Sequence, residues 1–298
     1  MDHYLGIDVG GTKVAFRVET GTGPVDETAF GWGPRHSAEA DLAQLAGHVA
    51  ELRTRLGSPL RAVGVAMPGT AGPDGRVTAW PSRPEWTGLA LDVALRDLFP
   101  GSVVAWADDG DLGALAEARA AGCDNLLYVG VGTGIGGGLV LHGEPCPGTA
   151  RGSFELGHVV VELDGPPCVC GRRGCLQAIA SGPATLDRAA RLRGTAVTFD
   201  DLRQAWGDGR PWAVDAVRRT ARALAAAVTG VQELVHPDRV VIGGGFAAGL
   251  PGFAGRVSEH LAEFARPGQP PLPAAPAALG GLSSLRGAVS LARLVATR

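Results

Sequence analysis

Lysine and asparagine are almost absent from this chain of 298 residues. Its 27 basic side chains include a single lysine, Lys13, and its only asparagine is Asn125. Such scarcity fits a background that replaces both residue types wherever a substitute serves, as in a GC-rich genome. An ordinary surface lysine would then have become arginine. The surviving lysine therefore marks a position that requires a compact ammonium group rather than a planar guanidinium.

An excess of positive charge and a long hydrophobic run are also missing. The net charge of -3 gives no general attraction to nucleic acid or to an anionic membrane. The arginine-rich stretches Arg188–Arg193 and Arg218–Arg222 are interpreted as solvated helix faces. The longest uncharged apolar stretch in a helical pattern, Ala223–Val231, is about half of a membrane span. The N-terminus shows no basic-then-apolar leader. We expect a soluble cytoplasmic protein with no nucleic-acid or membrane partner.

The chain opens with a strand, a glycine-rich tip and a second strand, and this pattern returns in its second half. The first hairpin joins His3–Val9 to Val14–Val18, and the second joins Asn125–Val131 to Gly138–Leu141. This weak internal duplication predicts an α/β protein of two related lobes. The other predicted elements are helices over Ala38–Leu56, Leu112–Ala121, Pro211–Val235 and Ser284–Thr297, strands over Arg61–Ala66, Val103–Ala107 and Arg239–Ile242, and a surface connection over Pro267–Pro276.

Three glycine clusters, at residues 10–11, 132–138 and 243–245, are candidate phosphate-binding tips, although each alone is also explained by a tight turn. Asp8 precedes the first tip at a position suited to Mg²⁺. The P-loop pattern fails because Lys13 enters a strand rather than a helix. The second tip matches a dinucleotide-binding pattern by letter, but a strand follows it. Strand–tip–strand phosphate loops used twice are typical of the actin-like ATPase and sugar kinase fold.

Three cysteines lie within eight residues, at Cys168, Cys170 and Cys175, and His158 lies upstream of them. Three thiolates and one imidazole form a closed tetrahedral site for structural zinc. A redox disulfide and unliganded thiols remain the alternatives. Buried spectator thiols are expected at Cys123 and Cys146.

These motifs together resemble the ROK family of sugar kinases and repressors along nearly the whole chain. The matching segments are Asp8-x-Gly-Gly-Thr-Lys13, Glu155-x-x-His158, the cysteine segment and Ile242-Gly-Gly-Gly245. The resemblance implies an actin-like, ribonuclease H-like fold with ATP, Mg²⁺ and a hexose in the cleft between its lobes. It places the first lobe at residues 1–110 with 284–298 and the second, with the zinc segment, at residues 111–283. It also implies a homo-oligomer, for which a homodimer is the expectation and a tetramer the alternative.

The resemblance further implies roles for individual residues. Asp109 is the candidate general base on the sugar 6-hydroxyl, and zinc is architectural, with His158 also contacting sugar. A helix N-cap run, which would account for Asp111, is the alternative reading of the acidic residues 108–111. The implied sugar contacts are Gly69, Ser82, Asp108, Asp109, Glu155, His158 and Gln177, the implied ATP contacts are Asp8, Gly10, Gly11, Thr12, Lys13, Gly132, Thr133, Gly134, Gly244 and Gly245, and the implied metal ligands are His158, Cys168, Cys170 and Cys175.

Three sugar-contacting positions depart from the family pattern. Asn is replaced by Asp108, Glu by Gln177, and the Asn of a Pro-Asn-Leu-x-x-Trp segment by Ser82. The asparagine shortage alone would explain Asp108 and Ser82, but not Gln177. A carboxylate facing ring hydroxyls favours an ammonium group.

The departures lead to the hypothesis of a free amino hexose, such as 3-amino-3-deoxyglucose (kanosamine), phosphorylated at O6. An ordinary glucokinase and an N-acylhexosamine kinase are the alternatives within the family. A non-catalytic sugar sensor is the alternative of another class. A repressor of the same family would need a DNA-binding winged helix before Asp8, where the chain leaves no room.

Overall fold

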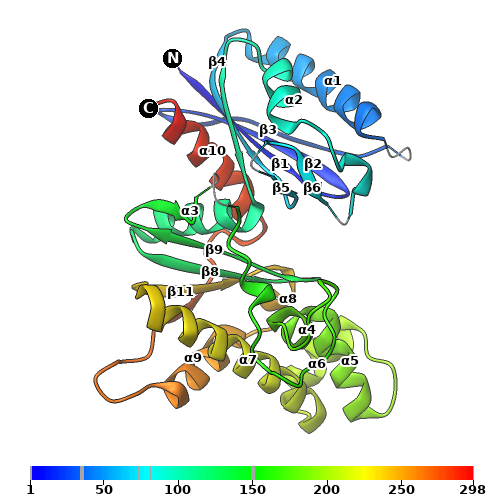
Figure 1. The fold of residues 1–298 in the computed structure, drawn as a ribbon, viewed down its shortest axis with the longest axis vertical. Helices are drawn as coiled ribbons and strands as arrows, with labels where there is room; N and C mark the ends of the chain where they lie inside the picture. Colours follow the sequence, from blue (N-terminus) through cyan, green and yellow to red (C-terminus); the bar gives the residue numbers. More distant parts are fainter. Residues whose placement is uncertain (1, 34–36, 73, 81, 149–151, 298) are drawn as a thin grey trace. The chain divides into compact units, whose positions relative to one another are not determined.

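The computed structural model describes residues 2–33, 37–72, 74–80, 82–148 and 152–297 and is an α/β structure with two five-stranded sheets (Figure 1). Its contacts divide the chain into two compact units. One comprises Met1–Ala116, Pro145–Ser153 and Leu282–Arg298, and the other comprises Glu117–Glu144 and Phe154–Gly281. The lobe boundaries expected at 110/111 and 283/284 stay a prediction.

The sheet of the first unit has the order β3-β2-β1-β4-β7. Its first three strands are antiparallel, whereas β4 and β7 run parallel to β1. Strand β3 was not predicted, because its largely exposed residues lack the alternation of a half-buried strand. The strands are β1 (His3–Val9), β2 (Lys13–Thr20), β3 (Gly23–Gly31), β4 (Leu60–Ala66) and β7 (Val103–Ala107), and a separate two-stranded sheet holds β5 (Thr70–Ala71) and β6 (Val77–Ala79).

Helix α10 (Ser283–Val295) packs on this sheet, as Figure 1 shows for the red helix beside the blue strands. Glycines permit the close approach: a Cβ at Gly64 would lie 2.0 Å from the Ala288 carbonyl oxygen. Helix α1 (Ala38–Leu56) has the predicted bounds, because the Ser37 hydroxyl caps its start and Gly57 ends it in the left-handed conformation. The remaining helices of the unit are α2 (Leu91–Leu98), a 3₁₀ turn (Pro84–Trp86) and most of α3 (Asp109–Ala121).

The sheet of the second unit repeats the order of the first, as β10-β9-β8-β11-β12. Strand β9 is antiparallel to β8, and β11 and β12 are parallel to it. This repeat confirms the predicted duplication. The expected surface connection over residues 267–276 is partly wrong, because its last three residues form β12 against β11. The strands are β8 (Leu126–Val131), β9 (Ile135–Leu141), β10 (Glu144–Cys146), β11 (Arg239–Gly243) and β12 (Ala274–Pro276).

Helices pack around α7 in the second unit, with α5 and α9 making extensive contacts along it. The helices are α4 (Leu176–Ala180), α5 (Gly182–Arg193), α6 (Phe199–Gly207), α7 (Pro211–Val235), α8 (Gly245–Ala248) and α9 (Phe253–Phe264), with 3₁₀ turns at Leu156–His158 and Gly280–Leu282. Within the described ranges, no helix combines the length and the apolar character that a membrane crossing needs.

Candidate active site and metal centre

The first glycine-rich tip closes the β1–β2 hairpin. The N–H of Gly10 donates to the carbonyl oxygen of Lys13 at 3.0 Å, and Thr12 and Lys13 are exposed. Because Lys13 opens strand β2, the exclusion of a P-loop is confirmed. Two side chains that the sequence did not single out also bind this tip. Trp32 donates a hydrogen bond to the Gly10 carbonyl, and Arg83 donates one to the Gly11 carbonyl.

Asp8 is the penultimate residue of β1 and lies two residues before the first glycine of this tip. Burial and the negative charge of Asp109 raise the pKa of Asp8 to about 6, while the Lys13 ammonium opposes the rise. The pKa therefore reports two carboxylates and one ammonium acting on one another within the first unit. The two carboxylates suit a divalent cation, because both gain from a nearby positive charge, and the Lys13 ammonium suits a phosphate.

The acidic segment that follows β7 begins α3. The helix starts at Asp109, three residues earlier than predicted, so the N-cap interpretation of Asp111 is wrong. Asp108 occupies that position instead, and its carboxylate accepts a hydrogen bond from the N–H of Gly110 at 2.9 Å. Asp109 is half-buried in the first turn of α3, whereas Asp111 is buried.

Two more predicted sugar contacts lie in the first unit. Ser82 is exposed and packs against the first tip, since a Cβ at Gly11 would lie 2.5 Å from its hydroxyl oxygen. Gly69 follows β4 and is buried, and a Cβ there would lie 2.9 Å from the Met67 methyl carbon. Ser82 therefore lies at the tip, whereas Gly69 packs against the side chain of Met67.

The second tip joins β8 to β9. The N–H of Gly132 donates to the carbonyl oxygen of Gly134 at 3.0 Å, and Thr133 and Gly134 are exposed. The N–H of Gly182, at the start of α5, holds this tip through the Gly132 carbonyl at 2.8 Å. A strand follows the tip, so the rejection of a dinucleotide-binding motif is confirmed.

The third tip lies beside the second, within the same unit. Gly244 has a φ of 87°, and a Cβ there would lie 2.4 Å from the Val131 backbone N. Only glycine fits this approach to the end of β8. A cavity of about 340 Å³ opens here, and its walls include Gly243, Gly244, Gly245, Phe253, Pro276 and Gly280.

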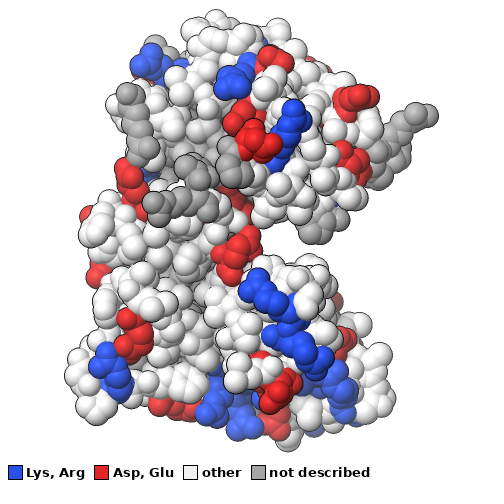
Figure 2. Space-filling view, viewed as in Figure 1, with Lys and Arg blue, Asp and Glu red and all other residues white. Residues whose placement is uncertain are grey.

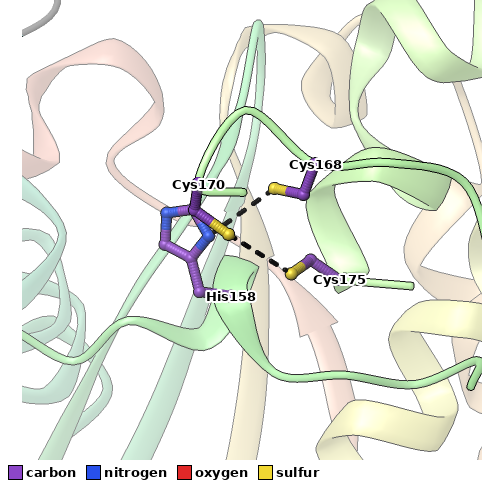
Figure 3. A group of neighbouring side chains, drawn as sticks. All are labelled: His158, Cys168, Cys170 and Cys175. Carbon is purple, nitrogen blue, oxygen red and sulfur yellow. Dashed lines mark hydrogen bonds between the residues drawn. The ribbon is translucent and has the colours of Figure 1, made fainter. Parts of the chain in front are cut away.

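The predicted metal ligands converge in the second unit (Figure 3). One ligand atom each from His158, Cys168, Cys170 and Cys175 lies within 4.8 Å of all the others. Nδ1 of the histidine is 3.8 Å from Sγ of Cys168, and Sγ of Cys170 is 3.6 Å from Sγ of Cys175. A tetrahedral zinc with Zn–S bonds near 2.3 Å separates its sulfur ligands by about 3.8 Å. The residues therefore fit a tetrahedral metal ion.

A glycine turn builds this centre. The N–H of Cys168 donates to the carbonyl oxygen of Arg172 at 2.7 Å, and Gly171 has a φ of 88°. The backbone N–H of Arg172 lowers the pKa of the exposed Cys170 thiol, whereas burial raises that of Cys175. Cys123 and Cys146 were expected to be buried but are half-buried, because Cys123 lies in the turn after α3 and Cys146 ends the edge strand β10.

Gln177 links the metal centre to the second tip. Its amide Nε2 donates to Sγ of Cys168 at 3.5 Å, and a Cβ at Gly134 would lie 3.2 Å from its Oε1. The histidine ring turns its other nitrogen, Nε2, toward the exposed carboxylate of Glu155 at 4.0 Å. His158 and Gln177, two of the predicted sugar contacts, therefore both lie against the cysteine cluster.

The chain is similar in sequence and in fold to known proteins. The ROK family model matches residues 4–294. The chain is 71% identical to a kanosamine kinase from Amycolatopsis mediterranei over 99% of this chain and 97% of that protein. The ROK hexokinase from Thermus thermophilus superimposes with a TM-score of 0.87 at 30% identity over 99% of both chains. A ROK family glucokinase from Streptomyces griseus, solved with glucose and AMPPNP, has a TM-score of 0.79 at 25% identity over 98% of this chain and 99% of that one. The chain therefore belongs to the ROK family, has its actin-like ATPase fold and is a hexose kinase.

Proposed function

We propose that this kinase transfers the γ-phosphoryl group of ATP to the 6-hydroxyl of kanosamine. The observation that carries the substrate is the 71% identity with a kanosamine kinase, which extends over 99% of the chain. A free amino sugar is also the ligand that the Asp108 carboxylate favours, because an ammonium–carboxylate pair out of water is stronger than a neutral hydrogen bond.

The proposed reaction gives a distinct role to each group of predicted residues. Asp109 accepts the proton of the sugar 6-hydroxyl, and Asp8 holds Mg²⁺ through its water shell. The ammonium of Lys13 and the backbone N–H groups of the first two tips bind phosphate oxygens. The cavity beside Gly244 and Gly245 receives the adenosine part of ATP, as its small, glycine-lined walls suit a flat base.

Asp108 selects the amino sugar in this proposal. The hydrogen bond from Gly110 N–H fixes the orientation of its carboxylate, and the N-terminus of α3 favours the ionised form. Its charge also repels that of Asp109, and a bound ammonium relieves this repulsion. Gly69, Ser82, Glu155, His158 and Gln177 contact the sugar hydroxyls.

Asp108→Asn tests the substrate. ADP release with Mg-ATP is measured for kanosamine, glucose, glucosamine, N-acetylglucosamine and N-acetylmannosamine. We expect the wild type to prefer kanosamine, and we expect the variant to lower the kanosamine-to-glucose ratio of kcat/KM at least tenfold, since a charged pair becomes a neutral one. Unchanged selectivity would contradict the role of Asp108.

The same panel separates the alternatives. A wild-type preference for glucose identifies an ordinary glucokinase, and one for acetylated sugars identifies an N-acylhexosamine kinase. Sugar binding without turnover on any substrate identifies a sugar sensor. Each of these three outcomes overturns the proposed substrate.

We also propose that the metal at the centre is Zn²⁺ with an architectural role, and Gln177 provides its test. Its amide donates to Sγ of Cys168, whereas the apolar side chain of Gln177→Leu offers no donor to that sulfur. We expect a chromogenic chelator to remove zinc at least tenfold faster from this variant. Gln204→Leu is the matched control, because Gln204 is exposed on α6 and remote in sequence from the ligands. Equal release rates in both variants would count against the contact.

Three further expectations complete the proposal. We expect the chain in the cytoplasm, where ATP and the reduced thiols that zinc binding needs are available. Family likeness supports a homodimer, which light scattering checks as a mass twice that of the chain. The lobes are residues 1–110 with 284–298 and residues 111–283.

A further inference from the structure

The carbonyl groups of the first tip all accept hydrogen bonds from a neighbouring part of the same unit. Indole Nε1 of Trp32 donates to the Gly10 oxygen at 2.8 Å, and guanidinium Nε of Arg83 donates to the Gly11 oxygen at 3.0 Å. The backbone N–H of Trp32 donates to the Thr12 oxygen at 3.1 Å. Two residues thus hold three consecutive carbonyls.

This anchoring determines where the N–H groups of the tip point. In a trans peptide the N–H points opposite to the carbonyl of the same peptide unit. The bonds to Gly10 and Gly11 oxygens therefore direct the N–H groups of Gly11 and Thr12 away from the anchor. The guanidinium of Arg83 stacks on the Trp32 ring at 4.5 Å, so both donors approach from one side. The two N–H groups consequently share the opposite side, which is the arrangement of an anion-binding nest.

A buried ion pair supports the anchor. Arg83 is paired with Asp41 of α1 at 2.5 Å, and their side chains are 2% and 1% exposed. Trp86 also donates its indole Nε1 to the same carboxylate oxygen, at 2.8 Å. Removing two charges from water is costly, and an apolar side chain at residue 83, such as the leucine of the family pattern, would avoid this cost. The pair is therefore better explained by what it positions than by stability.

We propose that Arg83 and Trp32 are positioning residues: they bind the carbonyl groups of the first tip so that its N–H groups face the phosphates of ATP. This inference rests on the proposed function, in which the tip binds ATP. Arg83 acts through the backbone of Gly11 and itself touches no substrate.

Binding of two ligands tests the inference. AMPPNP carries the phosphates and adenosine does not, so losing the anchor should weaken the first and spare the second. For Trp32→Phe, which keeps a ring beside Arg83 but removes the indole donor, we expect AMPPNP to bind about tenfold more weakly. We expect adenosine affinity to change less than twofold. Titration calorimetry measures the first ligand and ligand-observed NMR the second, and KM for Mg-ATP should rise while KM for the sugar stays constant.

Trp86→Phe is the matched control, because it removes a hydrogen bond to the same carboxylate without touching the tip. It should keep the wild-type affinity for AMPPNP. Arg83→Lys retains the positive charge opposite Asp41, so it should fold like the wild type. It lacks the second donor group that reaches the Gly11 carbonyl, so it should lose AMPPNP affinity. Equal losses for both ligands, or an equal effect of the Trp86 control, would show a merely structural anchor and overturn the inference. A wild type that binds no AMPPNP would overturn the proposed kinase reaction itself, whereas wild-type binding with unaffected variants overturns this inference alone.

Discussion

Asp109→Asn is expected to lower kcat about 10³-fold with the preferred sugar, while the affinity for sugar changes little. An amide cannot accept the proton of the 6-hydroxyl, and a positioned general base contributes roughly 10²–10⁴-fold to rate. Loss of the charge should also act on Asp8, because Asp109 helps to raise its pKa. The variant should therefore bind Mg²⁺ down to a lower pH than the wild type. Single-turnover kinetics and Mg²⁺ titrations at several pH values measure both effects.

Asp108→Asn is the control for this variant, since it makes the same chemical change one residue earlier. It removes the carboxylate that caps α3 but leaves the base, so turnover on glucose should persist. A kcat for Asp109→Asn within tenfold of the wild type would exclude Asp109 as the base. An equal collapse of both variants would indicate that the acidic segment acts through folding.

Local patterns account for what could be predicted of the fold. The β1–β2 and β8–β9 hairpins are predictable because apolar runs flank their glycines. Helix α1 is predictable because an apolar face lies between a capping residue, Ser37, and a terminating glycine, Gly57. Strand β3 was not predicted because it is an exposed edge strand, and β12 was not predicted because its two alanines and one proline carry no strand signal. Both strands form only because a neighbouring strand offers hydrogen bonds.

The candidate site divides in the same way. Cysteine spacing was sufficient to predict that the four candidate metal ligands converge, because three of them lie close together in sequence. The bond from Arg83 to the first tip joins residues 72 positions apart, and that from Trp32 joins residues 22 apart. Neither tryptophan nor arginine carries a local signal for such a role. A buried arginine becomes conspicuous only when the fold shows that its partner, Asp41, is buried as well.

Asp8→Asn should raise stability and abolish catalysis at the same time. The pKa of Asp8 is about 6 in the folded chain, compared with an ordinary value of 3.8. A carboxyl whose folded pKa is raised binds its proton more tightly when folded, so stability is lost as pH rises from about 4 to about 6. At pH 8 without Mg²⁺, replacing this buried charge should increase the free energy of unfolding by about 2–3 kcal/mol. Urea unfolding of the wild type and the variant across this pH range measures the difference.

Mg²⁺ should reverse the order of stability, and this reversal connects the pKa to function. The cation binds the ionised carboxylate of the wild type and stabilises the folded state by mass action. The asparagine variant lacks that charge, so added Mg-ATP should stabilise it far less. Below pH 6 protons compete with the cation at Asp8, and the KM for Mg²⁺ should rise about tenfold per pH unit. A variant less stable than the wild type at pH 8, or a difference that persists unchanged at pH 4, would show that the Asp8 carboxylate is not a destabilising charge. Mg²⁺ would then gain nothing by relieving unfavourable charge at Asp8, since a site that stores such charge must be more stable when the charge is removed.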